Sequence, residues 1–237
     1  MNAQSVPVII ALATPSDRDQ IYQIRHDVYA RELGQHSVNQ GASISDPLDK
    51  ENHYLVAKTG DRVLGFVSIT PPSAGRYSIE KYFQRDDIPF DFSDQLYEIR
   101  LLTVVDQKRH TLLFLLLGYA AYRWIEAHGG THACGMGRLL LTDLYQRIGL
   151  EPLPLFTTSG ELEYQLMHGP ISRLSKRATG AGVSDATLTY SVTTRVTTSG
   201  EVEGFVRKAM AAPMNISWAK ATSPMIQHET WKTPRWG

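Results

Sequence analysis

The sequence lacks the features that would place the protein on nucleic acid, on a membrane surface or in an oxidising compartment. Its 237 residues carry 24 Lys plus Arg and 24 Asp plus Glu, so the formal net charge at pH 7 is zero. Proteins that bind duplex DNA or anionic membranes need a basic excess, so we expect neither partner. The single cysteine, Cys134, cannot form an internal disulfide, which predicts a reducing compartment and a fold held by its core.

Long apolar runs are also missing. The longest covers residues 112–122 and falls short of the roughly 20 residues that cross a bilayer, so it predicts a buried helix. The apolar residues 8–13 are not preceded by Lys or Arg, which argues against a signal peptide. With one cysteine there can be no Cys-x-x-Cys pair, and we predict no metal site. These absences predict a cytoplasmic globular protein.

The periodicity of apolar residues predicts alternating strands and helices. Strands are expected at residues 6–14, 53–59, 62–70, 95–105, 131–135 and 187–197. Helices are expected at residues 16–33, 110–128, 138–148 and 201–212, with a short helical segment at 77–83. This order predicts a mixed α/β sheet with helices on its faces. Residues 1–200 are expected to form a single domain, and residues 201–237 a C-terminal helix and extended Pro/Trp tail packed on the body or on a partner.

Two segments resemble the GNAT superfamily of acyl-coenzyme A dependent N-acyltransferases. Residues 98–104 (Glu-Ile-Arg-Leu-Leu-Thr-Val) are similar to the fourth strand of that family. Residues 144–150 (Leu-Tyr-Gln-Arg-Ile-Gly-Leu) are similar to its Tyr-x-x-x-Gly-aromatic ending, with Leu150 in place of the usual Phe. The resemblance spans residues 8–150. It implies a GNAT-like mixed, mostly antiparallel sheet flanked by helices, and it implies N-acyltransferase activity.

The N-terminal half is similar to a branch of that superfamily, the acyl-homoserine-lactone synthases and N-acyl amino acid synthases. Their Arg-x-x-x-Phe and Asp-x-x-Asp patterns match Arg25-His-Asp-Val-Tyr29 and Asp46-Pro-Leu-Asp49. Because these positions line the acceptor site in the family, the resemblance implies that Arg25, Tyr29, Asp46 and Asp49 bind substrate. A guanidinium and two carboxylates together suit a zwitterionic acceptor. The alternatives are a solvated charge at Arg25 and a plain turn at Asp46.

The sequence departs from the pattern of the autoinducer synthases at two positions. No Trp lies between Tyr29 and Asp46, and the Arg that autoinducer synthases place on the strand after Gly65 is Ser68 here. Both positions belong to the signature of those synthases. The sequence therefore favours an acceptor other than S-adenosylmethionine.

Acyl transfer from a thioester to an amine needs a base for the amine. Glu98 lies on the strand that borders the acceptor in this superfamily, and the resemblance implies that it is the base. Strand alternation places Glu98, Arg100, Leu102 and Val104 on one face. Glu98 could therefore simply pair with Arg100, and Arg100 is either a partner for the acceptor carboxylate or a structural residue.

The leaving thiolate needs an acid. Tyr145 lies four residues before Gly149, where many GNAT enzymes place a phenol near the thioester sulfur, so the resemblance implies that Tyr145 is this acid. The alternative is a core Tyr on an amphipathic helix, with Leu141 and Ile148 as neighbours.

The acyl carrier is expected along the fourth strand and at the start of the next helix. Leu102 and Val104 are the candidates on the strand, and Arg109, His110 and Thr111 stand where the family has its pyrophosphate turn. This stretch contains no glycine, which obstructs a close approach of backbone to phosphate. Acyl-coenzyme A and the phosphopantetheine of acyl-carrier protein are therefore equal candidates, and no permanently bound cofactor is expected.

The leading hypothesis is an N-acyltransferase that acts on a small amino-acid-like amine. Two alternatives remain: an autoinducer synthase that uses S-adenosylmethionine, and a non-catalytic module that binds acyl-carrier protein. The C-terminal tail could close over the acyl chain or form a homodimer contact, and the sequence does not decide between them.

Overall fold

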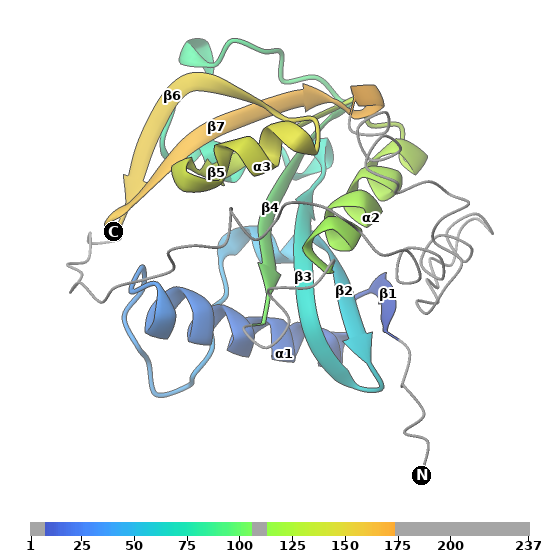
Figure 1. Ribbon diagram of the computed structural model, residues 1–237, viewed down its shortest axis with the longest axis vertical. Coiled ribbons are helices and arrows are strands. Elements are labelled where there is room, and N and C mark those ends of the chain that lie inside the picture. Colours follow the sequence, from blue (N-terminus) through green and yellow to red (C-terminus); the bar gives the residue numbers. More distant parts are fainter. Residues whose placement is uncertain (1–7, 106–112, 174–237) are drawn as a thin grey trace.

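The computed structural model describes residues 8–105 and 113–173, which form a seven-stranded mixed sheet with helices on both faces (Figure 1). The strand order is β1-β2-β3-β4-β5-β7-β6. Only β4 and β5 are parallel neighbours, and every other adjacent pair is antiparallel. The predicted fold class is confirmed. The strands are β1 (Ile9–Leu12), β2 (His53–Thr59), β3 (Arg62–Thr70), β4 (Leu96–Val104), β5 (His132–Arg138), β6 (Glu151–Ser159) and β7 (Leu162–Pro170).

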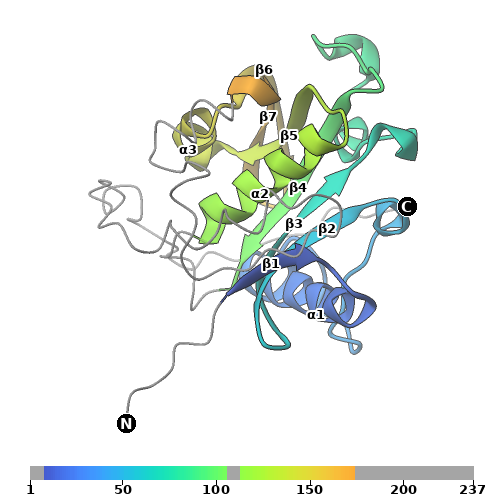
Figure 2. The same ribbon diagram turned by 90° about the vertical axis from the view of Figure 1, so that its right-hand side faces the viewer.

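The two main helices lie on opposite faces of the sheet, as Figure 2 shows. Helix α1 (Pro15–Arg25) begins at Thr14, whose side chain caps the backbone N–H of Asp17 while Asp17 caps Thr14 in return. Helix α2 (Leu113–Ala127) is apolar over most of its surface because it packs into the larger core cluster. The short helices near the site are η1 (His26–Glu32), η2 (Pro47–Lys50), η4 (Ser78–Lys81), η7 (Leu139–Leu141) and α3 (Thr142–Arg147).

The sheet divides into two halves between β4 and β5. These strands pair only at their beginnings, where Leu96, Tyr97 and Glu98 lie opposite His132, Ala133 and Cys134. Both strands continue beyond that point, β4 to Val104 and β5 to Arg138. Within the described residues, the remaining β4 edge therefore has no partner strand on its β5 side. We call this opening the split.

A β-bulge in β4 changes which of its residues share a face. Leu101 has a φ of 55°, and the register moves three residues along β4, from Arg100 to Thr103, for two along β3. Arg100 and Thr103 consequently face α1, whereas Leu102 and Val104 pack on the α2 side. The prediction that Leu102 and Val104 share a face with Glu98 and Arg100 is wrong for this reason.

Several predicted boundaries also change. The helix expected at residues 16–33 is α1 followed by the π-helix η1, in which the Leu33 N–H bonds the Val28 carbonyl at 2.8 Å. The hairpin of β6 and β7 was missed. Pro152 and Pro154 argue against a central strand, but β6 is an edge strand, where proline is tolerated.

Some predictions lie outside the described residues. They are the cofactor candidates Arg109, His110 and Thr111, the strand at residues 187–197, and the tail at residues 201–237. No helix within residues 8–105 and 113–173 is both long and apolar enough to cross a bilayer.

Candidate active site

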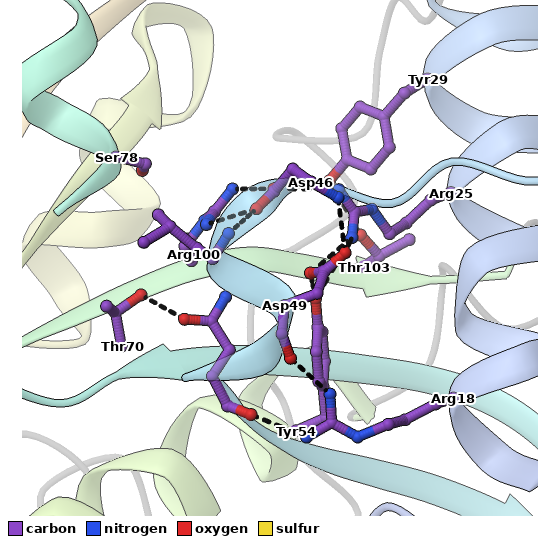
Figure 3. A network of polar contacts seen from close by, with 12 residues as sticks. Arg18, Arg25, Tyr29, Asp46, Asp49, Tyr54, Thr70, Ser78, Arg100 and Thr103 are labelled. Carbon is purple, nitrogen blue, oxygen red and sulfur yellow. Dashed lines mark hydrogen bonds and ion pairs between the residues drawn. The ribbon is translucent and has the colours of Figure 1, made fainter. Parts of the chain in front are cut away.

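Four predicted substrate-binding residues form one ion-pair network on the α1 face of the sheet (Figure 3). Arg25 at the end of α1 contacts both carboxylate oxygens of Asp49 at 2.9 Å and Asp46 Oδ2 at 3.0 Å. Arg100 on β4 contacts the same Asp46 oxygen at 2.6 Å. The structure thus brings together residues that lie up to 75 positions apart, because α1, η2 and β4 meet here.

The inner half of this network is structural. The side chains of Arg25 and Asp49 are 4% and 6% exposed, and Asp49 also accepts a hydrogen bond from the Tyr54 phenol. Burial raises the pKa of Tyr54, so the phenol remains a donor. Asp49 further accepts from the backbone N–H of Asp46. Arg25 and Asp49 therefore fix the 46–50 turn in place.

The outer half of the network is the part that a ligand can approach. Asp46 and Arg100 have side chains that are 14% and 10% exposed. Burial acts to raise the pKa of Asp46, but Arg100 and Arg25 outweigh it and hold that pKa below its usual range. A charged carboxylate and a guanidinium therefore stand side by side at the surface of the network.

Glu98, the predicted base, is fully buried beneath η4. Its carboxylate accepts hydrogen bonds from the Ser78 hydroxyl, the Ser78 backbone N–H at 2.8 Å and the Ile79 backbone N–H at 3.1 Å. Glu98 therefore holds the first turn of η4. Among the described residues, the carboxylate in direct contact with Arg100 is Asp46. Burial acts to lower the pKa of Arg100, while Glu98 is the nearby charge that most raises it.

Tyr145, the predicted acid, packs against Gly137 of β5. A Cβ at Gly137 would lie 2.7 Å from two ring carbons of Tyr145, so only glycine leaves room for this ring. Burial raises the pKa of Tyr145 to about 12, and a hydrogen bond from the Arg138 backbone opposes that rise. The phenol therefore keeps its proton at neutral pH.

Two further phenols lie at the split. Tyr29 on η1 shares a 3.0 Å hydrogen bond with Thr103 of β4. Tyr164 on β7 accepts a 2.7 Å hydrogen bond from Gln35. Tyr29 is predicted by the Arg-x-x-x-Tyr pattern. Gln35 and Tyr164 were not predicted. Tyr164 lies in the β6–β7 hairpin, which was not expected from the sequence.

Ser68 occupies the position where autoinducer synthases have Arg. It is fully buried, lies opposite Arg100 in the β3–β4 register, and its hydroxyl has no hydrogen-bond partner within the described ranges. The network is thus less basic on its Ser68 side than an Arg would make it.

The described part of the chain contains no cluster of His, Cys, Asp and Glu that could hold a metal ion. His128 and His132 have helical i,i+4 spacing, but His128 stacks on Trp124 and His132 stacks on His168. The two imidazole rings therefore have different stacking partners and do not form a metal-binding pair.

No protein-family model matches the sequence, and no curated protein matches it. Solved structures do match the fold. The CoA-dependent acyl-homoserine lactone synthase BjaI, with SAM and isopentyl-CoA, has a TM-score of 0.65 and 17% identity, over 82% of this chain and 97% of that chain. The AHL synthase LasI has a TM-score of 0.62 and 14% identity, over 73% of this chain and 95% of that chain.

FeeM, an N-acyl amino acid synthase from uncultured soil microbes, has a TM-score of 0.56 and 10% identity, over 72% of this chain and 94% of that chain. At such identities the likeness concerns the fold. The chain therefore has the GNAT-like fold of the acyl-homoserine lactone synthases and N-acyl amino acid synthases, as the sequence resemblance implied.

Proposed function

We propose that the protein is an N-acyltransferase that moves an acyl group from a pantetheine thioester to the amine of a small, amino-acid-like acceptor. The observation that carries the proposal is the partly exposed Asp46–Arg100 pair beside the split in the sheet. The Asp46–Arg100 pair offers opposite charges to a zwitterion. The split offers strand edges that have no neighbouring strand within residues 8–105 and 113–173. Both lie within a fold shared with enzymes named as acyl-homoserine lactone and N-acyl amino acid synthases.

The donor binds along the split. Along residues 99–103, the β4 edge has no β5 residue opposite it among the described residues. A pantetheine arm carries two amides and can pair with such an edge as an added strand would. Acyl-coenzyme A is the donor we favour, because BjaI was solved with isopentyl-CoA; acyl-carrier protein carries the same arm.

The acceptor binds at the outer half of the ion-pair network. Its ammonium group meets Asp46, and its carboxylate meets the guanidinium of Arg100. Arg25 and Asp49 hold the 46–50 turn beneath it. Tyr29, bonded to Thr103, marks the side of the site next to the split.

The reaction forms a C–N bond and breaks a C–S bond. The bound ammonium group first loses one proton to solvent. The amine nitrogen then attacks the thioester carbonyl carbon, and one of its remaining protons passes to the Ser78 hydroxyl while the Ser78 proton passes to Glu98. When the tetrahedral intermediate collapses, the sulfur leaves as a thiolate and takes the proton of Tyr145. Because burial raises the pKa of Tyr145 to about 12, the phenol is protonated at neutral pH and can donate to the sulfur.

An autoinducer synthase is the second candidate. It is favoured by the likeness to BjaI, whose structure holds SAM. Ser68 in place of the synthase Arg weighs against it.

Mass spectrometry of extracts from an overexpressing host tests the proposal. We expect acyl amides of amino acids that are absent from the same host carrying Tyr145→Phe. Acyl lactones would instead support the second candidate, and the absence of any new acylated compound would contradict both.

A further inference from the structure

Tyr164 stands at the open end of the split. In the β5–β7 register it lies opposite Arg138, the last residue of β5, four positions beyond Cys134 where β4 and β5 part. Tyr164 is half-buried, so it remains accessible. Tyr145, Tyr29 and Arg138 all lie close enough to affect its pKa, which burial raises to about 12.

One segment bridges the two halves of the sheet at this end. Tyr29 bonds Thr103 on β4, and Gln35, six residues later, reaches the β6–β7 hairpin. The buried Gln35 amide nitrogen lies 2.7 Å from the Tyr164 oxygen and 3.3 Å from the Ser159 carbonyl oxygen. Because a carbonyl oxygen can only accept, this contact fixes the amide orientation, with the nitrogen donating to both.

The direction of these hydrogen bonds decides which phenol O–H groups remain available to donate to a ligand. The Tyr164 oxygen accepts from Gln35, so its own O–H remains to donate, and no residue within 8–105 and 113–173 accepts it. Tyr145 likewise accepts from the Arg138 backbone. Tyr29 differs: the Thr103 hydroxyl donates to the Leu101 carbonyl, so Tyr29 must donate to Thr103.

We propose that Tyr164 is a second hydrogen-bond donor to the thioester, and that Gln35 is the positioning residue that turns its O–H toward the split. The inference rests on the proposed acyl transfer and deepens it. Tyr145 packs with the α2-side core, whereas Tyr164 lies on the opposite face of β7. The two phenols therefore approach the split from opposite faces of the sheet. Tyr145 protonates the sulfur, and Tyr164 donates to the carbonyl oxygen as negative charge develops on it.

The test compares Tyr164→Phe with Gln35→Glu. Loss of one such donor typically lowers kcat by about 100-fold, and we expect that loss in Tyr164→Phe with little change in KM. Gln35→Glu keeps the side-chain shape but supplies a carboxylate that accepts a hydrogen bond from the Tyr164 O–H. The O–H is then turned away from the split, so this variant should lower kcat similarly. The double variant should be no slower than Tyr164→Phe. Tyr82→Phe, an exposed phenol outside the site, is the matched control.

A readout independent of turnover separates this inference from the proposed function. In protein labelled with ¹³C at tyrosine Cζ, the Tyr164 resonance is assigned by its absence in Tyr164→Phe. We expect it to shift when a ketone analogue of acyl-coenzyme A is added, in which a methylene separates carbonyl and sulfur. If no thioester is turned over but the resonance shifts, the proposed function fails and the inference stands. An unshifted resonance, or an unchanged kcat in Tyr164→Phe, overturns the inference.

Discussion

At the scale of single residues, the predicted site divides into residues that hold its shape and residues that a ligand can reach. Arg25 and Asp49 are satisfied by one another and by Tyr54. Asp46 and Arg100 remain at the surface of the network. Arg25, Asp46 and Asp49, which the sequence pattern singled out, do lie together; their binding of substrate stays a prediction. The spacing of residues in a sequence does not indicate how deeply each side chain is buried, so it could not separate these two roles.

Asp49→Asn should destabilise the protein strongly. The substitution leaves the buried Arg25 guanidinium without its main counter-charge, and breaking a buried pair typically costs about 3 kcal/mol or more. Urea unfolding followed by circular dichroism measures the loss. Asp27→Asn, which breaks an exposed pair with Arg31, should cost less than about 1 kcal/mol. Equal losses in the two variants would contradict the structural role of Asp49.

Gly137→Ala should impair activity through Tyr145. The new Cβ would lie 2.7 Å from the Tyr145 ring, so the phenol must move, and a misplacement of about 1 Å can cost about 100-fold in rate. Gly118→Ala in α2 is the matched control, because its Cβ would meet only Leu102 at 3.9 Å. That change should leave kcat intact and add up to about 1 kcal/mol of stability. A normal kcat in Gly137→Ala would remove Tyr145 from the mechanism.

At the scale of elements, the paired strands β2 and β3 were predicted with the bounds that the structure has, whereas three local irregularities were not. The bulge at Leu101 depends on one positive φ in a Leu-Leu pair, and neither leucine predicts a positive φ. The π-helix η1 continues the apolar spacing of α1. The hairpin of β6 and β7 was hidden by prolines that only an edge strand tolerates.

The contact of Gln35 with the β6–β7 hairpin should be visible in backbone exchange. Gln35→Leu removes the hydrogen bonds to Tyr164 and Ser159, which hold the hairpin tip. We expect faster hydrogen exchange of the amides at residues 159–162 and unchanged exchange in β2, measured by mass spectrometry. Exchange that is equally fast in the unaltered protein would mean that Gln35 does not hold the tip.

At the scale of the whole molecule, the fold places the site where two half-sheets part. The order of strands and main helices from β1 to α3 follows from hydrophobic periodicity, and this part of the fold was predicted. Contacts such as that of Gln35 with Tyr164 join residues more than 120 positions apart, and they leave no local pattern in the sequence.

The stability of the whole chain should fall between pH 6.5 and pH 4 in a way that depends on His168. Burial, with His132 nearby, lowers the pKa of His168 to about 4, below the unfolded value of about 6.5. In this window the unfolded chain binds a proton that the folded chain does not, so the free energy of unfolding decreases as pH falls. His168→Phe keeps a ring against Phe90.

Chemical denaturation at pH 7 and pH 5 measures this dependence. We expect the unaltered protein to lose more stability between the two pH values than His168→Phe. An identical loss in both proteins would show that His168 titrates alike in the folded and unfolded states.

The central claim, acyl transfer from a thioester to an amine, is tested most directly with the purified protein and ¹³C-labelled acyl-coenzyme A in the presence of amino acids. Free thiol and labelled amide are quantified together by mass spectrometry. The account predicts equal amounts of both, a rate that depends on the amino acid, and a large loss of both products in Tyr145→Phe. Thiol release without amide, or amide formation at the same rate in Tyr145→Phe, would contradict it.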